Sequence, residues 1–314
     1  MAARIVVLGG VNMDLVLHTE RLPRPGETVE AQSFDTTPGG KGGNQAVAAA
    51  RALGEPGAVA MVGRVGDDAY GEQLVAYLDE AGVDTSRVRR VVGASSGLAI
   101  IAIDGEGENT VTAVYGANGS VGAEEADSVA ELVQGAAILL VQQETPLEPT
   151  RAAMQAARTS GALVILDPAP ARVLPKGFLR HASIITPNQT EAEALSGIPA
   201  GGVESARRAA ATIRERHAVD TVIVTLGGDG ALVCGPRTEV HVPAFHVKAV
   251  ASVAAGDAFN GALAAALAEG QPLEAAARFA AAAGALCVTR DGAAASMPFR
   301  EEILELAATG RLRA

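Results

Sequence analysis

Short apolar runs alternate with longer amphipathic segments along most of the chain. Six runs are β-branched or continuously apolar and are bounded by Gly, Pro or Asp, which predicts buried strands. The longer segments between several of them predict helices. The strands are expected at 4–8, 59–62, 137–141, 163–167, 183–186 and 221–225, and the helices at 44–53, 71–80, 147–158 and 205–216. This order predicts a three-layer α/β/α fold whose mostly parallel sheet binds ligands beyond the carboxyl ends of its strands.

Two regions depart from this alternation. Residues 15–19 and 27–34 alternate apolar and polar positions, and residues 97–103 and 110–115 form two strand-like runs joined by a turn-forming sequence. These four segments predict a small antiparallel sheet. Because the first segment follows the first strand, we interpret this sheet as a lid over the ligand site, the alternative being an edge hairpin without function. We expect one domain over residues 1–314, with lid strands from about 12–38 and 95–117.

Composition narrows the class of protein. Of 314 residues, 48% are hydrophobic and 19% charged, as in ordinary globular proteins. A net charge of -11 and an aromatic content of 3%, with no Trp, argue against a nucleic-acid partner. Charged residues and Pro interrupt the Ala-rich stretches 262–268 and 275–285, so we expect buried helices there and no membrane span. Two cysteines, Cys234 and Cys287, and an N-terminus without a signal-like apolar region indicate a cytoplasmic protein.

Polar and Gly-rich segments follow the first strand. Asn12 and Asp14 follow the end of this strand. A carboxylate there can accept hydrogen bonds from two neighbouring hydroxyl groups, which suits a polyol; a turn or helix cap is the alternative.

Residues 39–44, Gly-Gly-Lys-Gly-Gly-Asn, open an Ala-rich helix. Clustered glycines let backbone N–H groups approach a ligand closely, although the spacing is not that of a Walker A loop. Lys41 and Asn44 are therefore candidates to hold sugar oxygens.

A second Ala-rich helix opens with residues 254–261, and Asp257 lies at its start. The backbone N–H groups of Ala255, Gly256 and Asp257 can form an anion hole, aided by the helix dipole. Phosphoryl transfer needs such a hole and a group that takes the proton of the attacking hydroxyl, which a carboxylate can do. An ordinary N-cap Asp is the alternative, and this motif alone does not decide between them.

Two further motifs suit a nucleotide and its metal ion. Asn188 and Glu191 stand three residues apart after a predicted strand. They can hold water ligands of Mg²⁺, form a capping box, or do both. Residues 225–230 form a Gly-rich turn that suits nucleotide phosphates, although hairpin turns have the same composition.

Taken in this order, the segments resemble the ribokinases of the phosphofructokinase-B-type carbohydrate kinase family. The resemblance covers residues 6 to about 303 and rests on the GGKGxN-like block at 39–44 and the AAGDxFNGA-like block at 254–262. Shorter matching segments lie at 105–109, 116–118, 144–148, 167–171, 288–290 and 298–303. The resemblance implies a ribokinase-like fold and transfer of the γ-phosphoryl group of ATP to a hydroxyl of a small sugar, with ribose the expected acceptor.

The resemblance also implies roles for individual residues. The sugar would be bound by Asn12, Asp14, Gly40, Lys41, Gly42, Gly43, Asn44, Glu144 and Asp257. Asp257 would be the catalytic base, with Ala254, Ala255 and Gly256 completing the anion hole. ATP would be contacted by Asn188, Thr225, Leu226, Gly227, Gly228, Asp229, Gly230, Gly256 and Ala281. Glu191 would place Mg²⁺ through water. The lid of these kinases also pairs two subunits, which implies a homodimer.

One position departs from the family pattern. Ribokinases typically bind an activating potassium ion beside the anion hole, with an Asp side chain as one ligand, and the matching residue here is Ala251. The other implied contacts are mostly backbone carbonyls, at Val253, Cys287, Arg290, Gly292 and Ser296. Because the only carboxylate of this site is missing, we expect activation by monovalent cations to be weak or absent.

Two other functions stay open. The first is a kinase of another acceptor, such as deoxyribose, adenosine or fructose. The second is a non-catalytic sugar or nucleotide sensor on the same fold. A sensor predicts erosion of the base or the anion hole, whereas Asp257 and Gly256 are both present.

Overall fold

A computed structural model describes residues 4–106 and 108–312 of the chain; Gly107, within the predicted turn at 104–109, lies outside them. Within these ranges the main sheet has nine strands in the order β13-β12-β11-β10-β9-β8-β1-β4-β5. Their bounds are β1 (Ile5–Leu8), β4 (Val59–Gly66), β5 (Val83–Val91), β8 (Ile138–Val141), β9 (Leu163–Leu166), β10 (Ile184–Ile185), β11 (Thr221–Thr225), β12 (Ala231–Cys234) and β13 (Glu239–Val242). Only β12 runs against its neighbours, so the expected mostly parallel sheet is confirmed.

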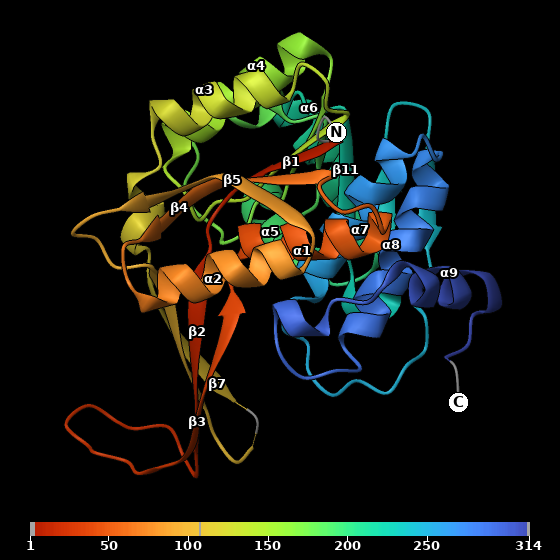
Figure 1. Ribbon diagram of the computed structural model, residues 1–314. Helices are drawn as coiled ribbons and strands as arrows, with labels where there is room; N and C mark the ends of the chain where they lie inside the picture. Colours follow the sequence, from red (N-terminus) through yellow and green to blue (C-terminus); the bar gives the residue numbers. More distant parts are fainter. Residues whose placement is uncertain (1–3, 107, 313–314) are drawn as a thin grey trace.

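Helices cover both faces of this sheet (Figure 1). One layer holds α1 (Lys41–Leu53), α2 (Ala69–Glu80), α7 (Ala255–Ala268), α8 (Leu273–Cys287) and α9 (Arg300–Thr309). The opposite layer holds α3 (Ala123–Leu132), α4 (Leu147–Ser160), α5 (Gln189–Ser196) and α6 (Val203–His217). The central strands are apolar throughout because each contributes side chains to both cores. In β1, Ile5 and Val7 face the first layer, and Val6 and Leu8 the second.

The Ala-rich stretches form α7 and α8, as expected. Small side chains allow α7 to lie close against α1, and at Gly261 a Cβ atom would come within 2.4 Å of the Ala48 Cβ. No helix in the described part of the chain combines the length and apolar character that crossing a membrane requires.

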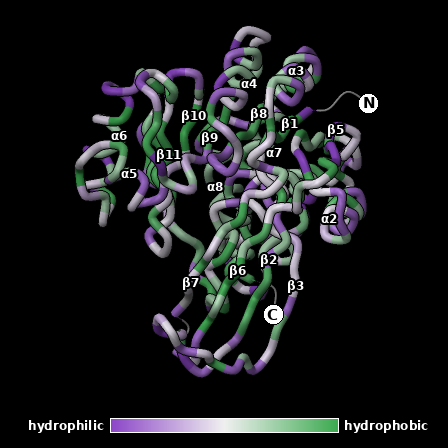
Figure 2. The backbone as a smooth tube through the Cα atoms, turned by 90° about the vertical axis from the view of Figure 1, so that its left-hand side faces the viewer, coloured by the Kyte–Doolittle hydropathy of each residue, from purple (hydrophilic) through white to green (hydrophobic). Residues whose placement is uncertain are grey.

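The predicted small sheet is present and projects from the main body (Figure 2). Its strands are β2 (Asn12–Thr19), β3 (Ala31–Gly39), β6 (Gly97–Ile103) and β7 (Asn109–Val114), in the order β3-β2-β6-β7. The two outer pairs are antiparallel, whereas the central pair, β2 with β6, is parallel. This mixed pairing refines the expectation of an antiparallel sheet.

The second lid strand lies later in the chain than expected. Residues 27–34 were expected to form it, but β3 runs from Ala31 to Gly39. The reason is the loop before it, in which the Glu27 carboxylate accepts from the Arg24 backbone N–H at 3.1 Å and pairs with Arg21 at 2.5 Å. Glu27 therefore closes a turn and does not extend the strand.

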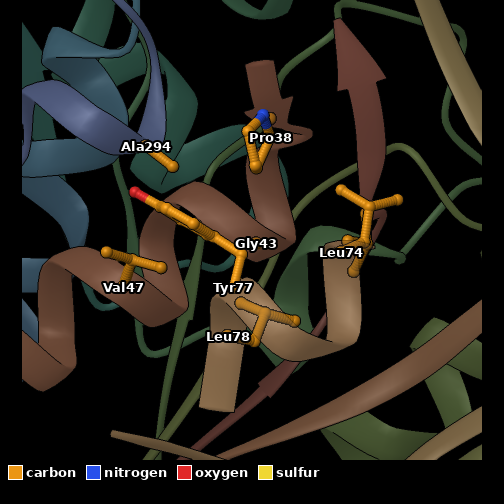
Figure 3. A pocket seen from close by; sticks show the side chains of 9 residues that line it. Pro38, Gly43, Val47, Leu74, Tyr77, Leu78 and Ala294 are labelled. Atoms are coloured by element: carbon orange, nitrogen blue, oxygen red, sulfur yellow. The ribbon is translucent and has the colours of Figure 1, made fainter. Parts of the chain in front are cut away.

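At its root, the lid packs against α1, α2 and the short helix η4 (Ala294–Ser296) around a small apolar cavity (Figure 3). Pro38 comes from β3, Val47 from α1 and Leu74 from α2. The Tyr77 side chain points across the gap toward Ala294. A volume of about 10 Å³ is roughly that needed for one water molecule, so this cavity is a packing gap and does not bind substrate.

Candidate active site

A cleft of about 690 Å³ opens at the carboxyl ends of β9, β10 and β11. Each strand delivers one polar side chain to it: Asp167 follows β9, Thr186 follows β10 and Thr225 ends β11. The opposite wall is formed by the start of α7 and by α8. This is the position expected for a ligand in a parallel α/β sheet.

Asp257 lies in the first turn of α7 and lines this cleft, although only 4% of it is exposed. Both of its carboxylate oxygens accept hydrogen bonds from consecutive residues of α1. Asn44 Nδ2 donates to Oδ2 at 2.9 Å, and Gln45 Nε2 donates to Oδ1 at 3.0 Å. These two donors hold the carboxylate in one orientation.

The start of α7 has the geometry of an anion site. Ala254 is its N-cap, with a left-handed backbone at φ 60°. The first N–H groups of a helix, here those of Ala255, Gly256 and Asp257, have no partner within the helix. A left-handed residue before them is typical of an anion-binding turn. Ala254, Ala255 and Gly256 all line the cleft. Asn260 braces the turn because its Nδ2 donates to the Gly256 carbonyl at 2.9 Å and its Oδ1 accepts from Thr186 Oγ1 at 2.7 Å.

The Gly-rich segment lets α1 begin against strand β1. Gly40 is the N-cap of α1, with φ 81°, a conformation that other residues rarely adopt. A Cβ atom at Gly42 would lie 2.7 Å from the Gly10 carbonyl oxygen. This close approach places Lys41, Asn44 and Gln45, which share one face of α1, beside Asp257.

Side chains from the lid root and from the segment after β8 complete a second, more enclosed group. Glu144 Oε2 accepts from the Lys41 backbone N–H at 2.8 Å. Asp14 is 7% exposed and lies close enough to Glu144 and Asp257 for their charges to affect it. Asn12 Oδ1 accepts from Asn118 Nδ2 at 2.8 Å. The predicted sugar-binding residues thus gather between the lid and α1.

Carboxyl groups surround the one lysine in this region. Burial, together with the charges of Glu144 and Asp257, raises the pKa of Asp14 to about 7. Burial also raises the pKa of Asp167 to about 7, although the ammonium of Lys41 opposes the rise. Lys41 Nζ lies 3.9 Å from Asp167 Oδ2. Burial alone would lower the pKa of Lys41, but the surrounding carboxyl groups outweigh it and raise the pKa, so the ammonium stays charged.

Most of the residues predicted to contact ATP line the same cleft as Asp257: Asn188, Thr225, Gly227, Gly228, Gly230, Gly256 and Ala281. Asn188 caps α5 and pairs with Thr225 in an isolated parallel bridge. The remaining two lie elsewhere, because Leu226 packs into the core and Asp229 is exposed beside the turn.

The predicted magnesium residue also lines the cleft. Glu191 and Asn188 form a capping box: the Glu191 backbone N–H donates to Asn188 Oδ1, and the Asn188 N–H donates to Glu191 Oε2, both at 2.9 Å. Among the described residues, no group of three or more His, Cys, Asp or Glu is placed to hold a metal ion. A single carboxylate fits Mg²⁺ held mostly by water and ATP oxygens.

The residues assigned to a monovalent cation fit that ion less well. The Cys287 thiol lies 3.6 Å from the Val253 carbonyl oxygen and 3.1 Å from Ser296 Oγ, so these three residues do gather. Ala251 donates its N–H to the Val288 carbonyl at 3.2 Å, but its side chain offers no oxygen. The side chain of Arg290 pairs with Glu302, and Gly292 occupies a loop at φ 93°.

Sequence reasoning assigned no role to Gln45, Gln142 or Asp167, which lie in or beside this site. Gln45 bonds both Asp167 and Asp257, and Gln142 bonds Gln45. A sequence signal existed for Gln45, because it lies four residues after Lys41 and next to Asn44 on a helix. Asp167 also stood at the predicted carboxyl end of a strand.

Comparison with known proteins decides the family. A model described as pfkB family carbohydrate kinase matches residues 2–300. The chain belongs to the pfkB family of carbohydrate kinases. Within the family, it is 40% identical to the ribokinase of Bacillus subtilis, over 96% of this chain and 98% of the relative. It is 36% identical to the deoxyribokinase of Salmonella typhi, over 96% and 97% respectively.

Solved structures of pfkB-type kinases agree with the fold described above. The Arabidopsis thaliana ribokinase complexed with ribose and ATP superposes with a TM-score of 0.91 at 35% identity, over 98% of this chain and 99% of that one. The phosphofructokinase-2 of Escherichia coli, in complex with potassium, superposes with a TM-score of 0.79 at 25% identity, over 99% of both chains. The three-layer fold with its small second sheet is therefore that of the ribokinases.

Proposed function

We propose that this sugar kinase transfers the γ-phosphoryl group of ATP to the primary hydroxyl of D-ribose, forming ribose 5-phosphate and ADP. The observation that carries the proposal is the placement of Asp257. Its carboxylate lines the cleft, is held by Asn44 and Gln45, and stands at the start of α7 beside unpaired backbone N–H groups. The relatives named ribokinase, and the one complexed with ribose and ATP, support ribose as the acceptor.

In the proposed reaction, Asp257 accepts the proton of the sugar hydroxyl while the hydroxyl oxygen attacks the γ-phosphorus of ATP. A bond forms between these two atoms, and the bond from the γ-phosphorus to the oxygen of the ADP leaving group breaks. The N–H groups of Ala255 and Gly256 stabilise the charge on the transferring group. Lys41, which lines the cleft, adds a positive charge near it. Bound Mg²⁺, with Glu191 holding its water ligands, would neutralise charge on the ATP phosphates.

Asp14, Asn12, Asn44 and Glu144 are proposed to bind the sugar. Two enclosed carboxyl groups can each accept from neighbouring hydroxyls of a furanose. A sugar that lacks one hydroxyl leaves a buried acceptor unpaired, which costs about 1–3 kcal/mol. Ribose should therefore be preferred to 2-deoxyribose by roughly 10-fold or more in kcat/KM.

Acceptor specificity is tested by measuring ADP release in parallel with ribose, 2-deoxyribose, fructose and adenosine. The proposal expects the highest kcat/KM for ribose. An equal or higher value for 2-deoxyribose would make the chain a deoxyribokinase, the alternative that its 36% identity to the Salmonella typhi enzyme keeps in view. No turnover with any acceptor would favour a sensor.

We also propose a homodimer joined through the lid. The lid strands carry exposed apolar side chains, among them Phe34 at 55% and Val111 at 58% exposure. Apolar side chains on a projecting sheet are typical of a contact surface. Sedimentation of the wild type and of a Phe34→Ser, Val111→Ser variant tests this; a wild-type monomer would refute the dimer.

Three further assignments complete the proposal. The chain is one domain with the lid as its appendage. It resides in the cytoplasm, in keeping with two buried cysteines that form no disulfide. Potassium activates it weakly or not at all, because Ala251 stands where the family has an Asp ligand and its side chain offers no oxygen.

A further inference from the structure

Gln45 is an unusual residue for its place in the fold. It lies in the second turn of α1, is fully buried, and is followed by the apolar residues that pack α1 against α7. A buried amide costs free energy unless its N–H and C=O groups are paired. Those of Gln45 are paired with side chains far away in the sequence, all at the active site.

The Gln45 amide joins two carboxyl groups. Its Nε2 donates to Asp257 Oδ1 at 3.0 Å and to Asp167 Oδ2 at 2.9 Å. A flipped amide would turn its oxygen toward both carboxyl groups, which is repulsive, so this orientation is strongly preferred. Gln142 reinforces the preference, because its Nε2 donates to Gln45 Oε1 at 2.6 Å. Gln142 comes directly after β8, and the central sheet thereby sets the orientation of the amide.

The hydrogen bonds from Gln142 to Gln45 and from Gln45 to Asp257 form a chain that ends at Asp257 Oδ1. Asn44 fixes Oδ2, and Gln45 fixes Oδ1. Without Gln45, the carboxylate could rotate about its bond to Cβ. The second carboxyl group, Asp167, would lose a donor that now lies between it and Asp257, and the repulsion between the two would increase. Both changes would move the base away from the position that proton transfer needs.

We propose that Gln45, oriented by Gln142, is a positioning residue for the base in the phosphoryl-transfer step. The inference rests on the proposed function, since it assumes that Asp257 takes the proton of the sugar hydroxyl. Gln45 itself lies behind Asp257 and outside the residues that line the cleft. Its loss should therefore reduce kcat while leaving the affinity for sugar and ATP nearly unchanged.

The test compares Gln45→Leu, Gln142→Leu and the double variant, using ribose and ATP. We expect kcat to fall roughly 10- to 100-fold in Gln45→Leu, with ribose Kd from calorimetry within about threefold of the wild type. Gln142→Leu should show a smaller loss of the same kind. Because both act on one chain of hydrogen bonds, the double variant should be no slower than Gln45→Leu.

The matched control is Gln143→Leu. Gln143 follows Gln142 in the sequence and is buried to the same extent. Its side chain has no hydrogen-bond partner among the described residues, so the kcat of Gln143→Leu should equal that of the wild type. A merely structural Gln45 would lower the melting temperature but leave kcat per folded molecule within twofold, and that result would overturn the inference. If Gln45→Leu does not fold, Gln142→Leu provides the test. An unchanged kcat in Gln142→Leu would then overturn the positioning role of Gln45.

The wild type separates the two claims. If it turns over no sugar, the proposed function fails. If it phosphorylates ribose and the glutamine variants match it in kcat, only the positioning role fails.

Discussion

Replacing Gly261 with Ala should disrupt the close packing of α1 against α7, which holds Asn44 and Gln45 beside Asp257. A Cβ atom at this position would lie 2.4 Å from the Ala48 Cβ, 2.7 Å from the Ala49 nitrogen and 2.8 Å from the Gln45 carbonyl oxygen. Two of these three atoms are backbone, so no side-chain rotation relieves the clash. Ordinary contacts of a Cβ atom are 3.4–4 Å. Helix α1 would therefore have to move away from α7 by about 1 Å.

The magnitude follows from this displacement. Overpacking costs roughly 1–3 kcal/mol, and the higher helix propensity of Ala returns up to about 1 kcal/mol. We expect a net loss of about 1–2 kcal/mol in the free energy of unfolding. The bonds from Asn44 and Gln45 to Asp257, now 2.9 and 3.0 Å, would lengthen past hydrogen-bonding distance. A misplacement of this size should lower kcat by roughly 10- to 100-fold.

Denaturant unfolding and a coupled ADP-release assay measure the two effects. Gly256→Ala is the control for stability, because a Cβ atom there meets nothing within 4 Å. A Gly261→Ala enzyme with wild-type stability and wild-type kcat would refute the claim that the α1–α7 contact positions the base.

Three other predictions follow from the site. Gly256→Ala should keep its stability but lose turnover, because the added methyl group stands in the cleft beside the anion hole; unchanged kcat with ribose would remove Gly256 from that hole. The unliganded protein should lose stability as pH rises from about 4 to about 7, because burial raises the pKa of Asp14 and Asp167 to about 7, so the folded state holds protons that the unfolded chain releases. Melting temperatures across this range should fall less steeply for Asp14→Asn and Asp167→Asn than for the wild type, and equal slopes would contradict the assignment. Turnover in potassium should match turnover in a bulky, non-binding cation within about twofold, and a large potassium-specific increase would show that the site works without a carboxylate at Ala251.

The central strands could be predicted from sequence because strands buried on both faces are apolar throughout, as in β1, β8 and β11. The strand β5 could not, since it lies at the sheet edge and places polar residues such as Asp84 and Arg87 among its apolar ones. Alternating apolar and polar positions predict the lid strands, but they do not show which strands pair or in which direction. The parallel pairing of β2 with β6 was therefore not predicted. Neither was the start of β3, which depends on how Glu27 closes the preceding loop.

The residues of the candidate site likewise fall into those that the sequence predicts and those that only the structure reveals. Motifs with glycine and a carboxylate at a helix start led to Asp257, Lys41 and Asn188, because their chemistry is encoded locally. Gln45 was missed because its partners are distant in sequence. Gln142 lies 97 positions away and Asp257 lies 212 positions away, so only the folded chain shows that this glutamine belongs to the site.

The central claim is that the Asp257 carboxylate draws the proton from the sugar hydroxyl. It is tested most directly by the turnover of Asp257→Asn with ribose and ATP, measured alongside ribose affinity by calorimetry. The account predicts that kcat falls roughly 10²- to 10⁴-fold while ribose binding stays measurable. A variant that folds, binds ribose and turns over at a near-normal rate would contradict it.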